Sequence, residues 1–105
     1  MPAVLERLIQ KIKPDKWDEL DEIDKRFDEV ESKYKFPPKR RYRSMVGPLD
    51  DNIIVIEREW KSMAKYEDAL LNSYGNPEEQ ALAAELADIM VQEWREVYLV
   101  WPLKV

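Results

Sequence analysis

One segment of the chain, residues 52–71, carries a strand pattern that passes directly into a helical pattern after Trp60, with no turn residues between the two. The consecutive apolar residues 53–56 place apolar side chains on both faces of the strand, because successive side chains alternate between faces. The helical half has apolar positions at the spacing of an amphipathic helix, namely Met63, Tyr66, Leu70 and Leu71. The segment therefore predicts a buried strand followed at once by a helix.

The remaining hydrophobic pattern predicts the other strands and helices. Strands are expected at residues 4–12, 39–46, 53–60 and 94–103. Helices are expected at residues 17–34, at residues 62–73, and from Pro77 through an apolar stripe that ends at Met90. Asp15 and Asn76 are suited to cap the first and third helices, and Glu79 is placed to complete a capping box with Asn76.

This order of elements, β-α-β-β-α-α-β, predicts an α+β fold of the split βαβ or ferredoxin-like type. The prediction is a single domain over residues 1–105, with a four-stranded antiparallel sheet and helices on one face only. The second crossover helix is broken near Gly75 to Pro77. Because the strand at residues 53–60 is apolar on both faces, the face without helices needs a cover. We expect a homodimer in which two sheets pack face to face and form an α+β barrel.

Composition narrows the possible functions. The chain has no Cys and no His, which removes thiolate chemistry and the commonest transition-metal ligands, so no metal and no cofactor are expected. A net charge of −5 argues against a nucleic-acid partner or an anionic membrane surface. The longest largely apolar run, residues 97–103, is far too short to cross a bilayer. A cytoplasmic location is the default expectation.

Four local motifs point to a known superfamily. They are the turn Lys13-Pro14-Asp15-Lys16, the junction Glu59-Trp60-Lys61-Ser62, the helix break Gly75-Asn76-Pro77-Glu78, and the aromatic last strand. In this order and spacing the chain resembles the dimeric α+β barrel superfamily, in particular its NIPSNAP-like and antibiotic-biosynthesis-monooxygenase-like members.

The resemblance implies a barrel of two ferredoxin-like subunits whose interior can hold a small hydrophobic ligand. Known activities in the superfamily include cofactor-free oxidation and haem degradation. Haem-degrading members hold the iron with a His, which this chain lacks. No catalytic residue is assigned from the resemblance.

The last strand offers one candidate ligand-binding set. Trp94, Glu96 and Tyr98 lie on one face at a period of two, and this face is less apolar than the opposite one. If it lines the barrel interior, the two aromatic rings would stack on an apolar ligand and Glu96 would act as a base. The alternative is that these residues belong to the dimer interface, with Glu96 paired to an Arg.

Three further residues are candidates for the pocket. Trp60 stands where the third strand ends, so it lines the mouth of a cavity or serves as a packing anchor. Arg41 and Arg43 share one face of the second strand, where they would clamp a ligand carboxylate. Alternatively they pair with acidic residues across the hairpin, for which Glu57 and Glu59 are available.

Two functions follow from these observations. The favoured one is a small homodimeric protein whose aromatic pocket binds a small apolar or aromatic ligand and performs no defined chemistry. The alternative is a cofactor-independent monooxygenase or isomerase that acts on an aromatic or polyketide-like substrate, with a Tyr or Glu handling the proton and an Arg holding an enolate. Fold alone does not choose between them.

Overall fold

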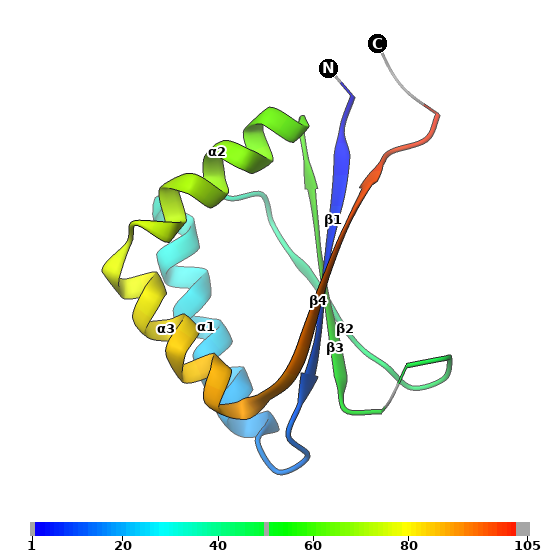
Figure 1. The fold of residues 1–105 in the computed structure, drawn as a ribbon, viewed down its shortest axis with the longest axis vertical. Helices are drawn as coiled ribbons and strands as arrows, with labels where there is room; N and C mark the ends of the chain where they lie inside the picture. The colour runs from blue at the N-terminus through cyan, green and yellow to red at the C-terminus, as the bar shows by residue number, and fades with distance from the viewer. Residues whose placement is uncertain (1, 50, 103–105) are drawn as a thin grey trace.

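A single antiparallel sheet with the spatial order β2-β3-β1-β4 forms one layer of the molecule (Figure 1). The computed structural model describes residues 2–49 and 51–102. Its strands are β1 (Val4–Ile12), β2 (Arg40–Arg43), β3 (Ile53–Trp60) and β4 (Met90–Leu99). The central strand β1 pairs with β3 on one side and β4 on the other. This arrangement confirms the predicted ferredoxin-like sheet.

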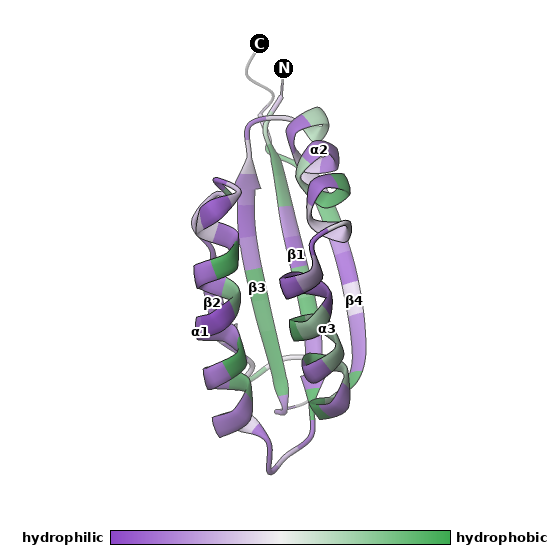
Figure 2. Ribbon diagram, turned by 90° about the vertical axis from the view of Figure 1, so that its left-hand side faces the viewer, coloured by the Kyte–Doolittle hydropathy of each residue, from purple (hydrophilic) through white to green (hydrophobic). Residues whose placement is uncertain are grey.

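Three helices form the second layer and cover one face of the sheet (Figure 1). They are α1 (Trp17–Lys33), α2 (Met63–Tyr74) and α3 (Pro77–Ile89). Helix α1 lies on the side of β2 and β3, whereas α2 and α3 lie on the side of β1 and β4 (Figure 2). The crossover helix is thus broken between α2 and α3, as the sequence predicted.

The break between α2 and α3 is built from local capping. The side chain of Asn76 accepts a hydrogen bond of 2.9 Å from the backbone N–H of Glu79, and Pro77 is the first helical residue. Ser62 caps α2 in the same way, accepting from the backbone N–H of Lys65 at 3.2 Å. Helix α1 differs, because its cap position is Lys16 rather than the expected Asp15, and no side chain caps it.

Two strand boundaries differ from the prediction. Strand β4 begins at Met90, where the sequence predicted helix, and ends at Leu99. It begins early because β1 offers a free edge along its whole length, so that Met90 already pairs with Ile12. Strand β2 is shorter than predicted and covers only Arg40–Arg43. The predicted end of the last strand, residue 103, lies outside the described residues.

Two groups of buried residues show how the sheet separates its faces. The helix side holds a core of Ile12, Leu20, Ile23, Ile54, Ile56 and Ile89. The opposite side, which we call the open face, holds a smaller cluster of Ile9, Ile53 and Val55. Neighbouring residues of β3 therefore point in opposite directions, so the consecutive apolar residues 53–56 supply both clusters.

Candidate functional site

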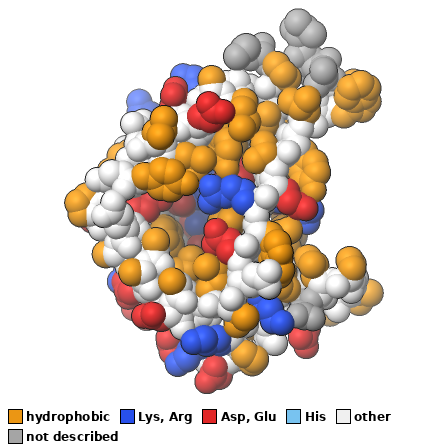
Figure 3. Space-filling view, viewed as in Figure 1, with side chains coloured by type: hydrophobic (Ala, Val, Ile, Leu, Met, Phe, Trp, Pro, Cys, Tyr) orange, Lys and Arg blue, Asp and Glu red, His pale blue; other side chains and the backbone are white. Residues whose placement is uncertain are grey.

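A cavity of about 250 Å³ lies between the sheet and the helices. Much of its wall is apolar and comes from both layers, including Leu8, Ile56, Phe27, Leu70 and Leu86. Figure 3 shows the hollow, with charged side chains surrounded by hydrophobic ones. A concave site of this kind, mainly apolar with a few converging polar groups, is the usual form of a small-molecule pocket.

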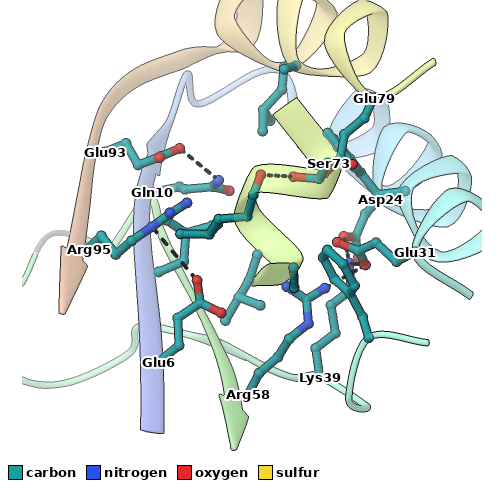
Figure 4. A pocket seen from close by; sticks show the side chains of 18 of the residues that line it. Glu6, Gln10, Asp24, Glu31, Lys39, Arg58, Ser73, Glu79, Glu93 and Arg95 are labelled. Atoms are coloured by element: carbon teal, nitrogen blue, oxygen red, sulfur yellow. Dashed lines mark hydrogen bonds and ion pairs between the residues drawn. The ribbon is translucent and has the colours of Figure 1, made fainter. Parts of the chain in front are cut away.

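Several polar groups of the cavity come from strand positions that face the helices. Strand β1 contributes Glu6 and Gln10, β3 contributes Arg58, and β4 contributes Glu93 and Arg95 (Figure 4). The register of the sheet brings them together, since Gln10 is opposite Glu93 and its amide donates to that carboxylate at 3.1 Å. The sheet surface under the helices is therefore not simply hydrophobic.

One side of the cavity is organised around Glu6 by two hydrogen bonds and one ion pair. The indole N–H of Trp60 donates to Glu6 Oε1 at 3.1 Å. Arg95 Nε lies 3.8 Å from Glu6 Oε2, and Arg95 also donates to the Tyr66 hydroxyl at 3.3 Å. Burial raises the pKa of the Tyr66 hydroxyl; the charge of Arg95 lowers this pKa, and the charge of Glu6 raises it. Tyr66 is thus held as a neutral phenol beside the cavity.

The other side of the cavity is an ion network centred on Lys39. Its side chain is only 7% exposed, and its Nζ lies 2.8 Å from Asp24, 3.1 Å from Asp28 and 3.2 Å from Glu31. Arg58 extends this network by contacting Glu31 at 2.5 Å. Because a buried charge is very costly without a partner, these contacts hold β2, β3 and α1 in a fixed relation. The acidic α1 helix is therefore not only a solvated surface.

Glu79 adds a carboxyl group from the first turn of α3. Burial raises its pKa, the neighbouring Glu31 raises it further, and Arg58 opposes both. Figure 4 places Glu79 on the same side of the cavity as Asp24 and Glu31. Since Glu79 turns towards the cavity, the expected capping box is only half formed, through its backbone N–H.

Trp60 is the one predicted site residue that lines this cavity. It is 5% exposed and packs against Phe36 and Tyr66 at ring centroid distances of 5.5 and 5.6 Å. Its large contact area makes it a packing anchor as well. Trp60 therefore both lines the cavity and serves as a packing anchor.

Arg41 and Arg43 face the helices but are outside the cavity lining. Arg41 pairs with Asp24 and lies 3.8 Å from Asp28, both on α1. The Arg43 guanidinium lies 3.9 Å above the Trp17 ring. The cross-strand pairing with Glu57 and Glu59 is wrong, because the register places Arg40 opposite Glu57 and aims Arg41 at α1.

Trp94, Glu96 and Tyr98 lie together on the open face, on the other side of the sheet from the cavity. Trp94 is opposite Ile9, and Tyr98 is opposite Leu5. Glu96 accepts a hydrogen bond of 3.1 Å from Arg7, which is the pairing that the interface interpretation required. These three residues remain candidates for an interface or a second ligand surface.

The sequence analysis did not single out Glu6, Arg58, Glu79 or Arg95 for the cavity. A signal existed for the first two, because each stands at a position of period two among apolar residues on the same strand face. A charged residue at such a position is predicted to be buried with a partner. Glu79 and Arg95 carry no comparable signal, because the tertiary packing alone brings them to the cavity.

By sequence, neither a protein-family model nor a curated protein matches the chain. Solved structures match it closely in three dimensions. A NIPSNAP family protein from Agrobacterium tumefaciens is 14% identical with a TM-score of 0.81, covering 95% of this chain and 94% of its own. A NIPSNAP-like domain protein from Burkholderia xenovorans is 15% identical with a TM-score of 0.77, covering 95% of this chain and 86% of its own.

The chain shares the NIPSNAP fold. A third match extends the likeness to the monooxygenase-like branch of the predicted superfamily. SnoaB, a cofactor-independent oxygenase from Streptomyces nogalater, is 13% identical with a TM-score of 0.65, covering 96% of this chain and 95% of its own. At such low identity the matches show the fold, and any chemistry has to be inferred from the residues of the cavity.

Within residues 2–49 and 51–102, no helix is long and apolar enough to cross a bilayer. The same residues contain no group of three or more acidic side chains arranged to hold a metal ion.

Proposed function

We propose that this NIPSNAP-fold protein binds a small, mainly apolar or aromatic molecule in the cavity between its sheet and its helices. The observation that carries the proposal is the cavity of about 250 Å³ with an apolar wall and converging buried polar groups. Its volume suits a molecule of one or two fused rings. Trp60 and Phe36 offer aromatic surface for such a ligand.

The protein is further proposed to act as a homodimer joined through the open face. The buried cluster of Ile9, Ile53 and Val55 lies beside aromatic side chains that remain exposed, Trp94 at 38% and Tyr98 at 46%. A second copy would cover these rings and leave the helix-side cavity of each copy accessible. In this proposal Trp94, Glu96 and Tyr98 are interface residues.

Ligand binding is tested with 2-naphthol and two variants of helix α2. Ala69 lines the cavity, so Ala69→Phe fills it and is expected to abolish binding. Ala64 lies on the same helix and is exposed, so Ala64→Phe is the matched control and keeps wild-type binding. Equal affinity in the two variants would reject the cavity as the site.

The indole N–H resonances of two tryptophans locate the bound ligand. Trp60 lines the cavity, whereas Trp94 lies on the open face. In a nuclear magnetic resonance titration with 2-naphthol, the Trp60 resonance is expected to move and the Trp94 resonance to stay. The reverse result would place the ligand on the face that carries Glu96 and Tyr98.

A second candidate function is cofactor-independent oxidation of a quinol-like substrate by O₂. The observations that favour it are the fold shared with SnoaB and the Tyr66–Arg95–Glu6–Trp60 chain beside the cavity. In this reading Glu6 takes a proton from the substrate and Arg95 stabilises the resulting anion.

Oxygen uptake with 1,4-dihydroxynaphthalene tests this second candidate. Uptake above the protein-free rate is expected to fall in Tyr66→Phe, which removes the hydroxyl that positions Arg95. It is expected to persist in Tyr98→Phe, whose ring lies on the other side of the sheet. No uptake above the protein-free rate would leave binding alone as the function.

A further inference from the structure

Two buried polar atoms of the cavity wall have no hydrogen-bond partner among the described residues. The first is Nε of Arg58, a residue that is 8% exposed. The guanidinium already contacts Glu31 through its terminal nitrogen at 2.5 Å and lies 5.2 Å from the Phe36 ring centroid. The Nε–H group is thus held in place by the two neighbours of its guanidinium, and an unmade hydrogen bond on a buried donor is unfavourable.

The second atom is Oε2 of Glu79. Glu79 is tied to α3 by its backbone N–H, which donates to Asn76 at 2.9 Å, so its carboxyl group is presented from a capped helix start. Arg58 and Glu79 line the same cavity. Burial raises the pKa of the Glu79 carboxyl, and the charge of Arg58 partly offsets this increase. One donor and one acceptor therefore belong to the same buried region.

The charges of the cavity wall argue against an anionic ligand, and the Arg58 guanidinium argues against a cation beside Glu79. The wall carries the cations Lys39, Arg58 and Arg95. It carries the acids Glu6, Asp24, Glu31, Glu79 and Glu93, which outnumber them. A ligand carboxylate would meet an excess of negative charge, and a ligand ammonium placed at Glu79 would meet the Arg58 guanidinium.

Resting on the proposed cavity-binding function, we propose that the cavity selects ligands whose polar group is uncharged and both accepts and donates a hydrogen bond. A hydroxyl or a primary carboxamide has this property. It accepts from Arg58 Nε and donates to Glu79 Oε2, while its ring lies against the apolar wall. The polar end of the ligand thereby sits at the Arg58–Glu79 side of the cavity, away from β4.

The test compares four ligands on one naphthalene framework by isothermal titration calorimetry at neutral pH. They are 2-naphthol, 2-naphthamide, 2-naphthoate and 2-methylnaphthalene. The first two are expected to bind about tenfold more tightly than the last two, since each makes two hydrogen bonds to charged side chains. Binding of 2-naphthoate as tight as that of 2-naphthol would overturn the proposal.

Glu79→Met tests the acceptor, because Met keeps the length of the side chain and removes its carboxylate. The variant is expected to lower the affinity for 2-naphthol about tenfold and to change the affinity for 2-methylnaphthalene by less than about twofold. Glu78→Met is the matched control, since Glu78 stands next in sequence, is exposed, and pairs with Lys33 outside the cavity. Equal losses for both ligands in Glu79→Met would indicate a packing defect and reject the hydrogen bond.

Arg58→Lys tests the donor while preserving the charge that faces Glu31. It is expected to weaken the binding of 2-naphthol and 2-naphthamide but to leave the affinity for 2-methylnaphthalene unchanged.

The ligand series also distinguishes a failure of the cavity-binding proposal from a failure of the selectivity proposal. If none of the four ligands binds, the cavity-binding function fails; if all four bind with equal affinity and Ala69→Phe blocks them, cavity binding stands and selection of an uncharged polar group fails.

Discussion

Lys39 on the helix side of the sheet and Arg7 on the open face each contact more than one carboxylate, but their surroundings differ. Lys39 has three acidic neighbours and a side chain that is 7% exposed. Arg7 lies 3.2 Å from Glu57 and 3.1 Å from Glu96, and its side chain is 31% exposed. Ion pairs of the same kind are thus buried on the helix side and partly exposed to water on the open face.

The difference is in line with the roles proposed for the two faces. On the helix side most of the polar groups are fixed by partners between the sheet and the helices, and together they surround a defined cavity. On the open face the ion pairs border apolar and aromatic side chains that are still exposed. The first arrangement suits recognition of a small molecule, and the second suits contact with another protein surface.

The largest expected effect is on the buried network. Lys39→Met removes the one cation that contacts all three of Asp24, Asp28 and Glu31 among the described residues and leaves the buried Asp24 and Glu31 with less compensation, so it is expected to lower the free energy of unfolding by about 3 kcal/mol. Urea denaturation followed by circular dichroism measures the loss. The control is Lys25→Met, whose partner Asp21 is 3.3 Å away on an exposed helix surface, and it is expected to cost about 0.5 kcal/mol or less. Equal costs would mean that the network is hydrated.

The next effect concerns the open face. Trp94→Asp is expected to weaken a homodimer by about 2 kcal/mol or more, because it places a charge among rings that the partner must cover. Sedimentation velocity at micromolar concentration is expected to give a dimer for the wild type and a 12.6 kDa monomer for the variant. The control Leu71→Asp, at a 71% exposed position of α2, is expected to remain dimeric. A monomeric wild type would contradict the open-face association.

A smaller effect is expected for the cation of the open face. In a monomeric background such as Trp94→Asp, adding Arg7→Met is expected to lower the free energy of unfolding by about 0.5–1 kcal/mol, because ion pairs that water reaches contribute little to stability. In the dimeric wild type the cost is expected to rise, because burial would leave Glu57 and Glu96 without their cation. Denaturation of both backgrounds at matched concentration measures the difference, and equal costs would place Arg7 outside the interface.

The smallest effect is a gain in stability from Glu79→Gln. Burial, joined by Glu31, raises the pKa of the Glu79 carboxyl in the folded protein above its ordinary value of 4.5. The folded state therefore favours the protonated form, and the stability from this preference is full below pH 4.5 and is lost as the pH rises through the folded pKa.

Gln resembles the protonated carboxyl, so Glu79→Gln is expected to be more stable than the wild type at pH 7, by about 0.5 kcal/mol after solvent screening. The advantage is expected to vanish near pH 4. Glu78→Gln, in the same helical turn, controls for the interaction with the helix dipole. Thermal unfolding across this pH range measures both variants, and an advantage that does not depend on pH would contradict the assigned cause.

The sequence by itself determined the order of elements and much of their placement. Apolar spacing identified β1, β3 and the three helices, because hydrophobic periodicity depends on local geometry that each element carries alone. The break at Asn76 and Pro77 was also local, since capping uses residues close in sequence. The apolar residues 53–56 further required that both faces of β3 be buried.

Only the tertiary structure decided where the polar residues go. Strand alternation stated that Trp94, Glu96 and Tyr98 share a face, but it gave no means of telling which face the helices cover. Similarly, Arg41 meets Asp24 through the packing of α1 on β2, and Glu79 reaches the cavity only because α3 lies over the β1 and β4 side of the sheet. Periodicity fixes which side chains point together, whereas the packing of distant segments decides what they point at.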